Sequence, residues 1–238
     1  MRARWAILIC VALPVSSSDA RSVKVYMNSG TGFIVSRDGH VITNDHVVKG
    51  CRQITVDGAV RPYNANVVGS SHTLDLALLQ MDGGSSEAAN LRSGSQPLEK
   101  GESVVIVGYP GNAKNPVTKE AKILNPKGPR GEEQWVEMDD VIQQGNSGGA
   151  VLDSAGNVVG VVAAKATIYT YPVDDPRAGT TRNSGIAISL PVLKEFLDRY
   201  RVRYREAESH NEYSSHRVTD IAERIMVHVR CAYKTEVQ

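Results

Sequence analysis

The chain has 238 residues, enough for one ordinary domain or two small ones with a sizeable core. Hydrophobic residues make up 41% and charged residues 22%, which argues against disordered, collagen-like and membrane-bundle proteins. A formal net charge of +1 gives no electrostatic reason to expect nucleic acid or an acidic membrane as a partner. Val outnumbers Leu by 30 to 13, and there are 21 Gly. Because β-branched residues and turn formers dominate, we expect an all-β fold.

The first 20 residues have the pattern of an export signal. Arg2 and Arg4 give a basic start, residues 5–15 are almost all apolar, and small polar residues follow. The apolar run is too short for a permanent membrane anchor, so we expect cleavage after residue 20 and an exported, periplasmic or secreted protein. A buried N-terminal helix is the alternative. A lipoprotein signal is not favoured, because a bulky residue precedes Cys10.

Removal of this signal leaves two cysteines, Cys51 and Cys231. An even pair in an exported chain predicts a disulfide, with two unpaired buried thiols as the alternative. His228 and Cys231 are spaced like a pair of metal ligands, but the sequence has no second pair nearby. We also find no phosphate loop or nucleotide fingerprint, so the sequence predicts neither a metal nor another cofactor.

Short apolar or alternating runs separated by turn residues extend from residue 22 to about residue 165. Examples are residues 32–35, 40–43, 53–56, 74–80 and 103–107. The turns at Asp38-Gly39 and at residues 153–157 predict hairpins, and this spacing is typical of a sandwich or of barrels. The polar segment 82–101 is the expected linker between two halves.

The C-terminal third begins with a predicted long, flexible loop over residues 168–184. Pro191 then opens a predicted helix, in which apolar residues recur at helical spacing. Residues 204–217 are polar, and we expect them to be loose. A short helix near residues 218–225 and a strand over residues 226–231 complete the prediction.

Three segments contain residue types suited to nucleophilic catalysis: Thr43–Val48 with His46, Thr73–Leu79 with Asp75, and Gln144–Gly149 with Ser147. Singly, they could be a surface histidine, a turn aspartate and a tight glycine turn. Together they supply a serine hydroxyl, an imidazole to take its proton and a carboxylate to orient that imidazole. The glycines around the serine let backbone N–H groups turn toward a developing oxyanion.

The order of these residues decides between two scaffolds. Residues 145–149 also fit the nucleophile elbow of α/β-hydrolases, which leads into a helix and has its acid and histidine downstream. Here Ser147 leads into a predicted hairpin, and His46 and Asp75 lie upstream. The order histidine, aspartate, serine on β structure is that of the chymotrypsin-like two-barrel proteases.

Longer motifs identify a family that the chain resembles. The segments are Gly30–Val35, Asp38–Val48, Asp75–Leu79, Gly145–Gly149 and Gly185–Pro191. Together they resemble, in order, the protease domain of the HtrA (Deg) family over residues 23–200. The resemblance implies two six-stranded, trypsin-like β-barrels in residues 21–205, with a C-terminal helix. Residues 206–238 would be a short helix–strand extension, too short for a PDZ domain.

The resemblance also implies an exported, cofactor-free serine endopeptidase that cleaves unfolded or damaged protein, with trimers as the common oligomer. His46 would be the general base and later the general acid, Asp75 its orienting partner, and Ser147 the nucleophile that forms an acyl-enzyme. The oxyanion hole would lie in the loop of Gly145, Asn146 and Ser147, with the N–H groups of Gly145 and Ser147 as donors. A catalytically silent trypsin-fold binding or chaperone module is the competing function.

Other positions refine the expected site. By the same resemblance, Val141, Val162 and Ala163 would form an apolar specificity pocket. Residues 160–164 lack side chains that could support Asp75, so backbone or water must do so. A disulfide would tie the C-terminal residues near His46, where they would either brace the first barrel or occlude the cleft.

Overall fold

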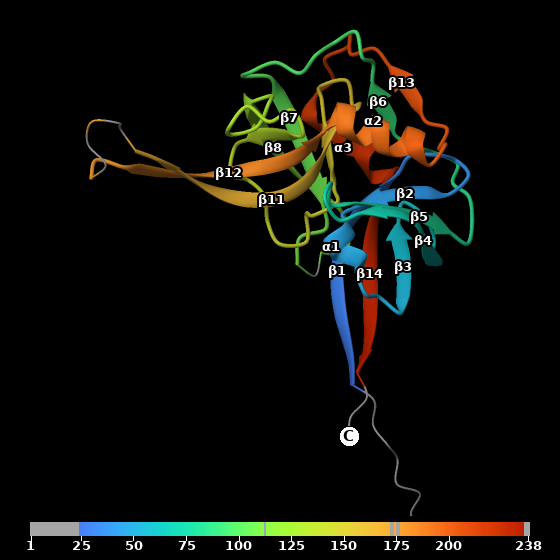
Figure 1. The fold of residues 1–238 in the computed structure, drawn as a ribbon. Helices are drawn as coiled ribbons and strands as arrows, with labels where there is room; N and C mark the ends of the chain where they lie inside the picture. Colours follow the sequence, from blue (N-terminus) through green and yellow to red (C-terminus); the bar gives the residue numbers. More distant parts are fainter. Residues whose placement is uncertain (1–23, 112, 172–173, 175–176, 236–238) are drawn as a thin grey trace, which may run out of the picture.

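The computed structural model describes residues 24–111, 113–171, 174 and 177–235 of the chain. The predicted export signal at residues 1–20 lies outside these described residues. Two six-stranded β-barrels form the body of the molecule, and Figure 1 shows them with two long β-ribbons projecting from them. The all-β, two-barrel prediction is therefore confirmed.

Barrel 1 closes in the strand order β1-β14-β3-β4-β5-β2. Its strands are β1 (Lys24–Ile34), β2 (His40–Thr43), β3 (Gln53–Gly58), β4 (Tyr63–Ser71), β5 (Leu76–Met81) and β14 (Met226–Thr235). The predicted hairpin at Asp38-Gly39 joins β1 to β2, and Gly39 has a φ of 92°, which glycine adopts without steric cost.

Barrel 2 closes in the order β10-β7-β8-β9-β12-β11, because β10 also pairs with β11. Its strands are β7 (Ser103–Gly108), β8 (Val117–Asn125), β9 (Trp135–Met138), β10 (Ala150–Leu152), β11 (Val158–Thr170) and β12 (Thr180–Ser189). The short strands β6 (Asn90–Arg92) and β13 (Arg205–Ala207) extend this sheet in parallel beside β11. Part of the predicted linker 82–101 is thus a strand.

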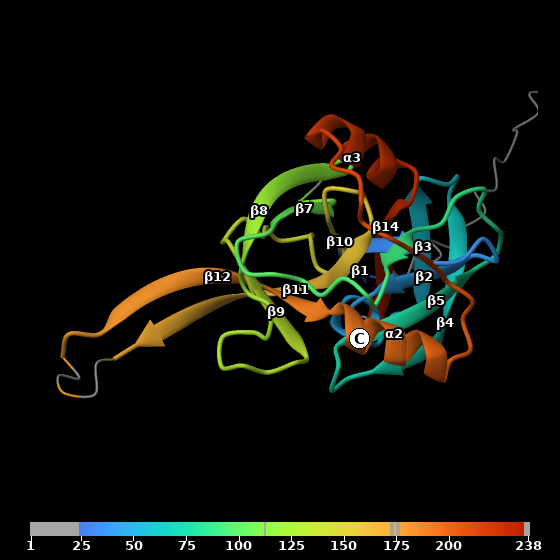
Figure 2. The ribbon, with the colours of Figure 1, turned by 90° about the horizontal axis from the view of Figure 1, so that it is seen from above.

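Three helices accompany the barrels: α1 (Asp45–Val48), α2 (Leu190–Arg199) and α3 (Ser215–Glu223). One buried cluster joins side chains of both barrels to α2 and α3, with Phe33 from barrel 1, Val107 from barrel 2 and Phe196 from α2 among its members. Figure 2 shows α2 and α3 on different sides of the barrels. Burial of these faces holds the two barrels against each other.

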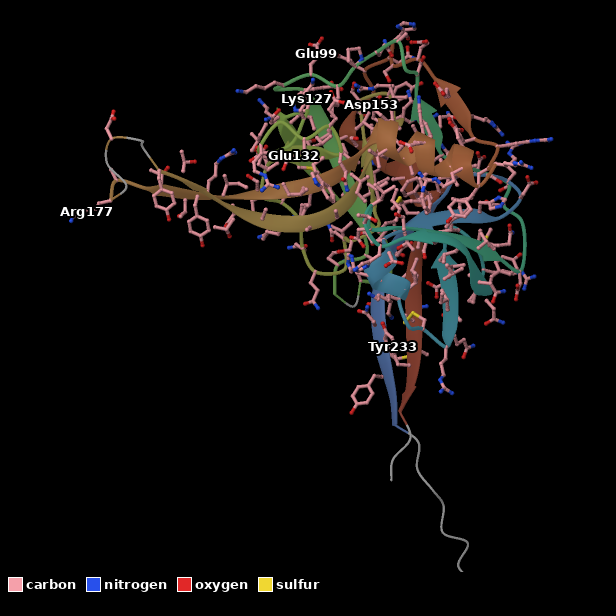
Figure 3. All side chains as sticks on the ribbon, viewed as in Figure 1. Glu99, Lys127, Glu132, Asp153, Arg177 and Tyr233 are labelled. Carbon is pink, nitrogen blue, oxygen red and sulfur yellow. A yellow bond between two sulfur atoms is a disulfide. The ribbon has the colours of Figure 1, made fainter. Side chains whose placement is uncertain are left out.

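The C-terminal strand β14 completes barrel 1 between β1 and β3. Its pairing runs through Val229, opposite Gly30 of β1 and Val56 of β3. Cys51 and Cys231 form the predicted disulfide, which lies near the labelled Tyr233 in Figure 3. Residues 226–235 are therefore an integral strand of the first barrel, which fits the bracing alternative for the C-terminal residues.

Two sequence predictions were wrong. Residues 204–217 are not uniformly loose, because they contain β13 and the start of α3, and Ser209 donates to the buried carboxylate of Asp153. The flexible loop predicted at residues 168–184 is also too long, because residues 168–170 and 180–184 belong to β11 and β12, which form a two-stranded ribbon whose far end carries the labelled Arg177 in Figure 3. Cross-strand pairing, which short-range patterns do not encode, forms β13 and extends β11 and β12.

Candidate active site

His46 and Asp75 meet where α1 faces the turn before β5. His46 Nδ1 lies 2.8 Å from Asp75 Oδ2 and 3.0 Å from Oδ1. The backbone N–H of His46 donates to the same carboxylate at 3.1 Å. This double contact fixes both the position of the imidazole and the nitrogen that faces Asp75, so the other ring nitrogen, Nε2, is left for a reacting group.

Asp75 adopts an unusual backbone conformation, with a φ of 52°. Left-handed conformations cost energy in residues other than glycine, although aspartate tolerates them better than most. Asn44 holds this turn, because its side-chain amide donates to the Asp75 carbonyl at 2.8 Å. Support for Asp75 thus comes from Asn44 and from the backbone of His46, within the motif around the histidine.

The contact with Asp75 raises the pKa of His46 above its usual 6.5, mainly through their hydrogen bond, while burial opposes the shift. The negative charges of Asp75 and Asp45 also raise the pKa of His46. The His46 side chain is still 48% exposed, so a substrate can reach it. An imidazole with these properties can accept a proton near neutral pH and stabilise the resulting charge.

The loop that carries Ser147 is fastened to barrel 1 by Thr31. The Thr31 N–H donates to the Ser147 carbonyl at 2.9 Å, and its hydroxyl donates to the Gly145 carbonyl at 2.6 Å. The same hydroxyl accepts the N–H of Tyr109 at 2.8 Å. Gly148, with a φ of 83°, brings the chain so close to Thr31 that a Cβ there would collide with the Thr31 carbonyl.

Among the described residues, the N–H groups of Gly145 and Ser147 have no hydrogen-bond acceptor, whereas the Asn146 N–H donates to the Gln143 carbonyl at 3.0 Å. The pair formed by Gly145 and Ser147 therefore retains free donors of the kind an oxyanion needs. Asn146, also predicted in this hole, does not contribute a free backbone donor in this conformation.

The Ser147 hydroxyl donates to the Ala163 carbonyl at 3.4 Å, which is the hydrogen bond the structure gives it. His46 and Asp75 are thus in contact, while Ser147 stands with its hydroxyl turned to β11. Rotation about one side-chain bond changes the direction of a serine hydroxyl, and catalysis with His46 would require the hydroxyl to leave Ala163.

The predicted specificity residues have different environments. Val162 is completely buried in the core of barrel 2, so its side chain does not line an open pocket in this structure. Val141 is half-buried and packs against the same cluster. Ala163 is beside Ser147, as its hydrogen bond shows. Val141 and Val162 thus belong to one apolar cluster, and a specificity pocket formed by these residues with Ala163 stays a prediction.

No group of three His, Cys, Asp or Glu side chains that could hold a metal ion occurs in the described part of the chain. The spacing of His228 and Cys231 does not reflect ligation, because Cys231 is in the disulfide and His228 stacks on Tyr109.

A cavity of about 540 Å³ lies between the start of α2 and the segments around Arg92 and Lys127, apart from His46, Asp75 and Ser147. In the described ranges, no helix is long and apolar enough to cross a membrane.

Sequence reasoning missed Thr31 and Asn44 as supports of the site. Both lie inside motifs that the sequence singled out, Gly30–Val35 and Thr43–Val48. The available signal in the sequence was a polar residue beside apolar strand residues. In the structure, Thr31 and Asn44 are both fully buried. Buried polar side chains need partners, and the Thr31 hydroxyl and the Asn44 side-chain N–H find theirs in backbone groups of the candidate active site.

Comparisons with known proteins identify similar chains. The family model for the trypsin-like peptidase domain matches residues 30–161, more than half of the chain. Serine protease HTRA4 from Mus musculus is 32% identical over 187 residues, which cover 74% of this chain and 35% of that protein. A probable periplasmic serine endoprotease, DegP-like, from Hahella chejuensis (strain KCTC 2396) is 33% identical over 179 residues, covering 73% of this chain and 36% of its own length.

Solved structures show the same fold. The HtrA-type protease AlgW with decapeptide is 29% identical with a TM-score of 0.58, over 71% of this chain and 50% of that chain. The serine endoprotease from Yersinia pestis has the same TM-score of 0.58 at 24% identity, over 76% of this chain and 62% of that chain. The chain spans about a third of the length of the two curated relatives named above.

Proposed function

This chain belongs to the trypsin-like peptidase family and is similar to HtrA and DegP serine proteases, and we propose on that basis that it cleaves peptide bonds in unfolded or damaged proteins. The observation that carries the proposal is the contact between His46 Nδ1 and Asp75 at 2.8 Å. That contact gives the imidazole the orientation and the raised pKa that a general base for a serine nucleophile requires.

The proposed reaction begins when the Ser147 hydroxyl turns from Ala163 toward His46. His46 Nε2 takes the hydroxyl proton as Ser147 Oγ attacks the substrate carbonyl, and Asp75 stabilises the imidazolium that results. The N–H groups of Gly145 and Ser147 receive the oxyanion. His46 then gives its proton to the leaving amine, and water repeats the sequence on the acyl-enzyme.

Several features of the whole protein extend this proposal. Residues 1–20 would direct export, and the DegP-like relative described as periplasmic agrees with that destination. The partners would be protein substrates and further copies of the chain, with a trimer expected from the family resemblance. Sedimentation of the mature protein measures this oligomeric state.

Reaction with a fluorophosphonate probe tests the proposed nucleophile. The mature protein should be labelled at Ser147, located by mass spectrometry, and the His46→Ala variant should not be labelled. The matched variant His72→Ala should still react, because the His72 side chain contacts Asp45, and only its backbone carbonyl, which alanine keeps, accepts from the Asp75 N–H. Label on another residue, or equal labelling of the His46→Ala variant, would contradict the proposal.

A catalytically silent binding module has one observation in its favour, the Ser147 hydroxyl directed at Ala163. On that alternative, the folded protein binds unfolded chains but neither reacts with the probe nor cleaves casein. The same experiment therefore separates the two functions.

A further inference from the structure

A small pocket lies between barrel 1 and the chain that follows α2. It has a volume of about 200 Å³, and its walls are residues 35–38, Ala88 and residues 203–205. The first of these segments is the turn between β1 and β2, whereas the last leads from α2 into β13. Figures 1 and 2 both show the chain after α2 passing beside this part of barrel 1. The candidate catalytic residues do not line the pocket, so it is separate from the candidate active site.

The backbone on both sides of the pocket is held in place. Arg205 pairs with Asn90 where β13 joins β6, and Tyr204 packs against the main buried cluster. On the other side, the carbonyl of Arg37 accepts the N–H of Ser85 at 3.0 Å. The pocket is therefore preformed, and only long side chains would have to become ordered around a ligand.

Three arginines of the pocket are without a partner. Arg37, Arg203 and Arg205 are exposed, and within the described part of the chain none of their guanidinium groups has an ion pair or a hydrogen bond. Asp38 is the one carboxylate among the described residues that line the pocket. The pocket thus has a local excess of positive charge, although the formal net charge of the whole chain is only +1. Like charges that are close together repel one another, and an anion between them removes that cost.

We infer that this pocket binds a phosphate monoester of a small molecule. A guanidinium group matches phosphate oxygens with two parallel hydrogen bonds, and a monoester offers three such oxygens with a charge of about −1.5 to −2 at pH 7. Three unpaired arginines therefore complement a monoester both in number and in charge. Val35, Ala88 and Tyr204 supply apolar surface for the rest of the molecule. That molecule must be small, because pockets for drug-sized ligands measure about 300–1,000 Å³.

Calorimetric titration of the mature protein with three matched compounds tests the inference. Glycerol 3-phosphate carries the monoester, glycerate carries a carboxylate on a similar body, and glycerol carries neither group. Glycerol 3-phosphate should bind about tenfold more tightly than glycerate, the gain from one further hydrogen bond to a charged group, and glycerol should not bind. Equal affinities for the phosphate and the carboxylate, or no binding of glycerol 3-phosphate, would overturn the inference.

Variants of the lining residues move the affinity in opposite directions. Arg203→Ala should weaken the binding of glycerol 3-phosphate by about tenfold, and Arg203→Lys, which keeps the charge but loses the planar fork, should recover only part of it. Asp38→Asn should strengthen binding, because it removes a negative charge from the lining.

The matched control for these variants is Arg224→Ala. Arg224 follows α3, is exposed, lies outside the pocket and has no ion pair among the described residues. This substitution lowers the net charge by the same amount as Arg203→Ala and should leave the affinity unchanged. Equal weakening by the two substitutions would show a general attraction to a positive protein and would contradict the pocket.

The same monoester can come from a soluble molecule or from a lipid headgroup, and vesicles separate the two sources. Phosphatidic acid presents glycerol 3-phosphate on a membrane surface. Flotation of the protein with phosphatidylcholine vesicles only when they contain phosphatidic acid, and its loss in Arg203→Ala, would assign the pocket to the lipid. Calorimetric binding without flotation assigns it to a soluble monoester, whereas flotation that ignores Arg203→Ala contradicts the pocket. None of these measurements depends on cleavage, so their results hold whether or not Ser147 is labelled.

Discussion

At the scale of single residues, the candidate site depends on a few side chains that are held by hydrogen bonds. Asp75 accepts from both the backbone and the ring of His46, and Asn44 fixes the turn that presents it. Thr31 performs the corresponding task for the Ser147 loop. Substitution of Asp75 tests its contact with His46, and substitution of Thr31 tests the attachment of the Ser147 loop.

Substitution Asp75→Asn should change both the rate and the pH profile. The carboxylate holds the pKa of His46 above 6.5, and a general base works only when neutral, so wild-type activity should rise as pH increases through that raised pKa. Without the negative charge, kcat should fall by about 10⁴, the loss that the same change causes in the catalytic triad of chymotrypsin-like proteases. The acid limb of the residual kcat/KM should move to lower pH. An acid limb at the wild-type position would contradict this role.

Substitution Thr31→Val keeps the shape of a fully buried side chain but removes its hydroxyl. The Gly145 carbonyl and the Tyr109 N–H would each lose a partner, so the loop with the oxyanion donors would be less firmly held. We expect kcat to fall by about 10- to 100-fold, less than the roughly 10²- to 10³-fold loss of an oxyanion donor itself. KM should change little. Thr31→Ser, which keeps the hydroxyl, should recover most of the rate.

At the scale of elements, β14 carries a histidine in an unusual setting. His228 is buried and stacks on Tyr109 with ring centroids 5.1 Å apart, and burial lowers its pKa, assisted by Arg230 and opposed by Asp57. Burial also raises the pKa of Tyr109 to about 12, so this ring stays neutral. The C-terminal strand is therefore packed against a residue that is joined to the Ser147 loop through Thr31.

Acidification should weaken this packing. The unfolded chain takes up a proton on His228 near pH 6.5, whereas the folded chain resists it, so this residue's contribution to the free energy of unfolding is lost as pH falls below 6.5. His46 acts in the opposite direction, because its pKa is raised in the folded state. Comparison with His228→Phe isolates the first contribution: urea unfolding at pH 8 and pH 5 should show a smaller decrease in the variant. Equal decreases would contradict the prediction.

At the scale of the whole molecule, barrel 1 joins the two ends of the described chain. Val227, Val229 and Cys231 of β14 are fully buried between β1 and β3. Burial of a valine side chain is worth about 1.5–3 kcal/mol, and a domain is stable by only about 5–15 kcal/mol. The strand at the far end of the sequence is thus necessary for the barrel that carries His46 and Asp75.

Deletion of residues 206–238 should therefore abolish cooperative folding, measured by circular dichroism and by dye binding to exposed apolar surface. The double variant Cys51→Ser/Cys231→Ser keeps the strand and is the matched control. It should fold but lose up to about 5 kcal/mol, the loop-closure value for a cross-link of this span. A deleted chain that unfolds cooperatively and cleaves peptides faster would instead identify the C-terminal residues as a brake.

Short-range patterns predicted a sandwich or barrels, the hairpins and the motifs of the site, and the resemblance to the HtrA family then favoured two barrels. Asp-Gly at residues 38–39 specifies a turn, and apolar alternation specifies a strand, whatever lies across the molecule. The sequence also predicted Cys51 with Cys231, because only one pairing remained once Cys10 was assigned to the signal.

Which distant groups meet is evident only in the folded chain. Neither the insertion of β14 between β1 and β3 nor the grip of Thr31 on residues 145 and 147 has a local signature, since each depends on backbone groups far away in the sequence. The same is true of residues 164–170, where a polar segment is a strand because β12 pairs with it. Side-chain patterns predict what a segment can form, and long-range hydrogen bonding and burial select what it does form.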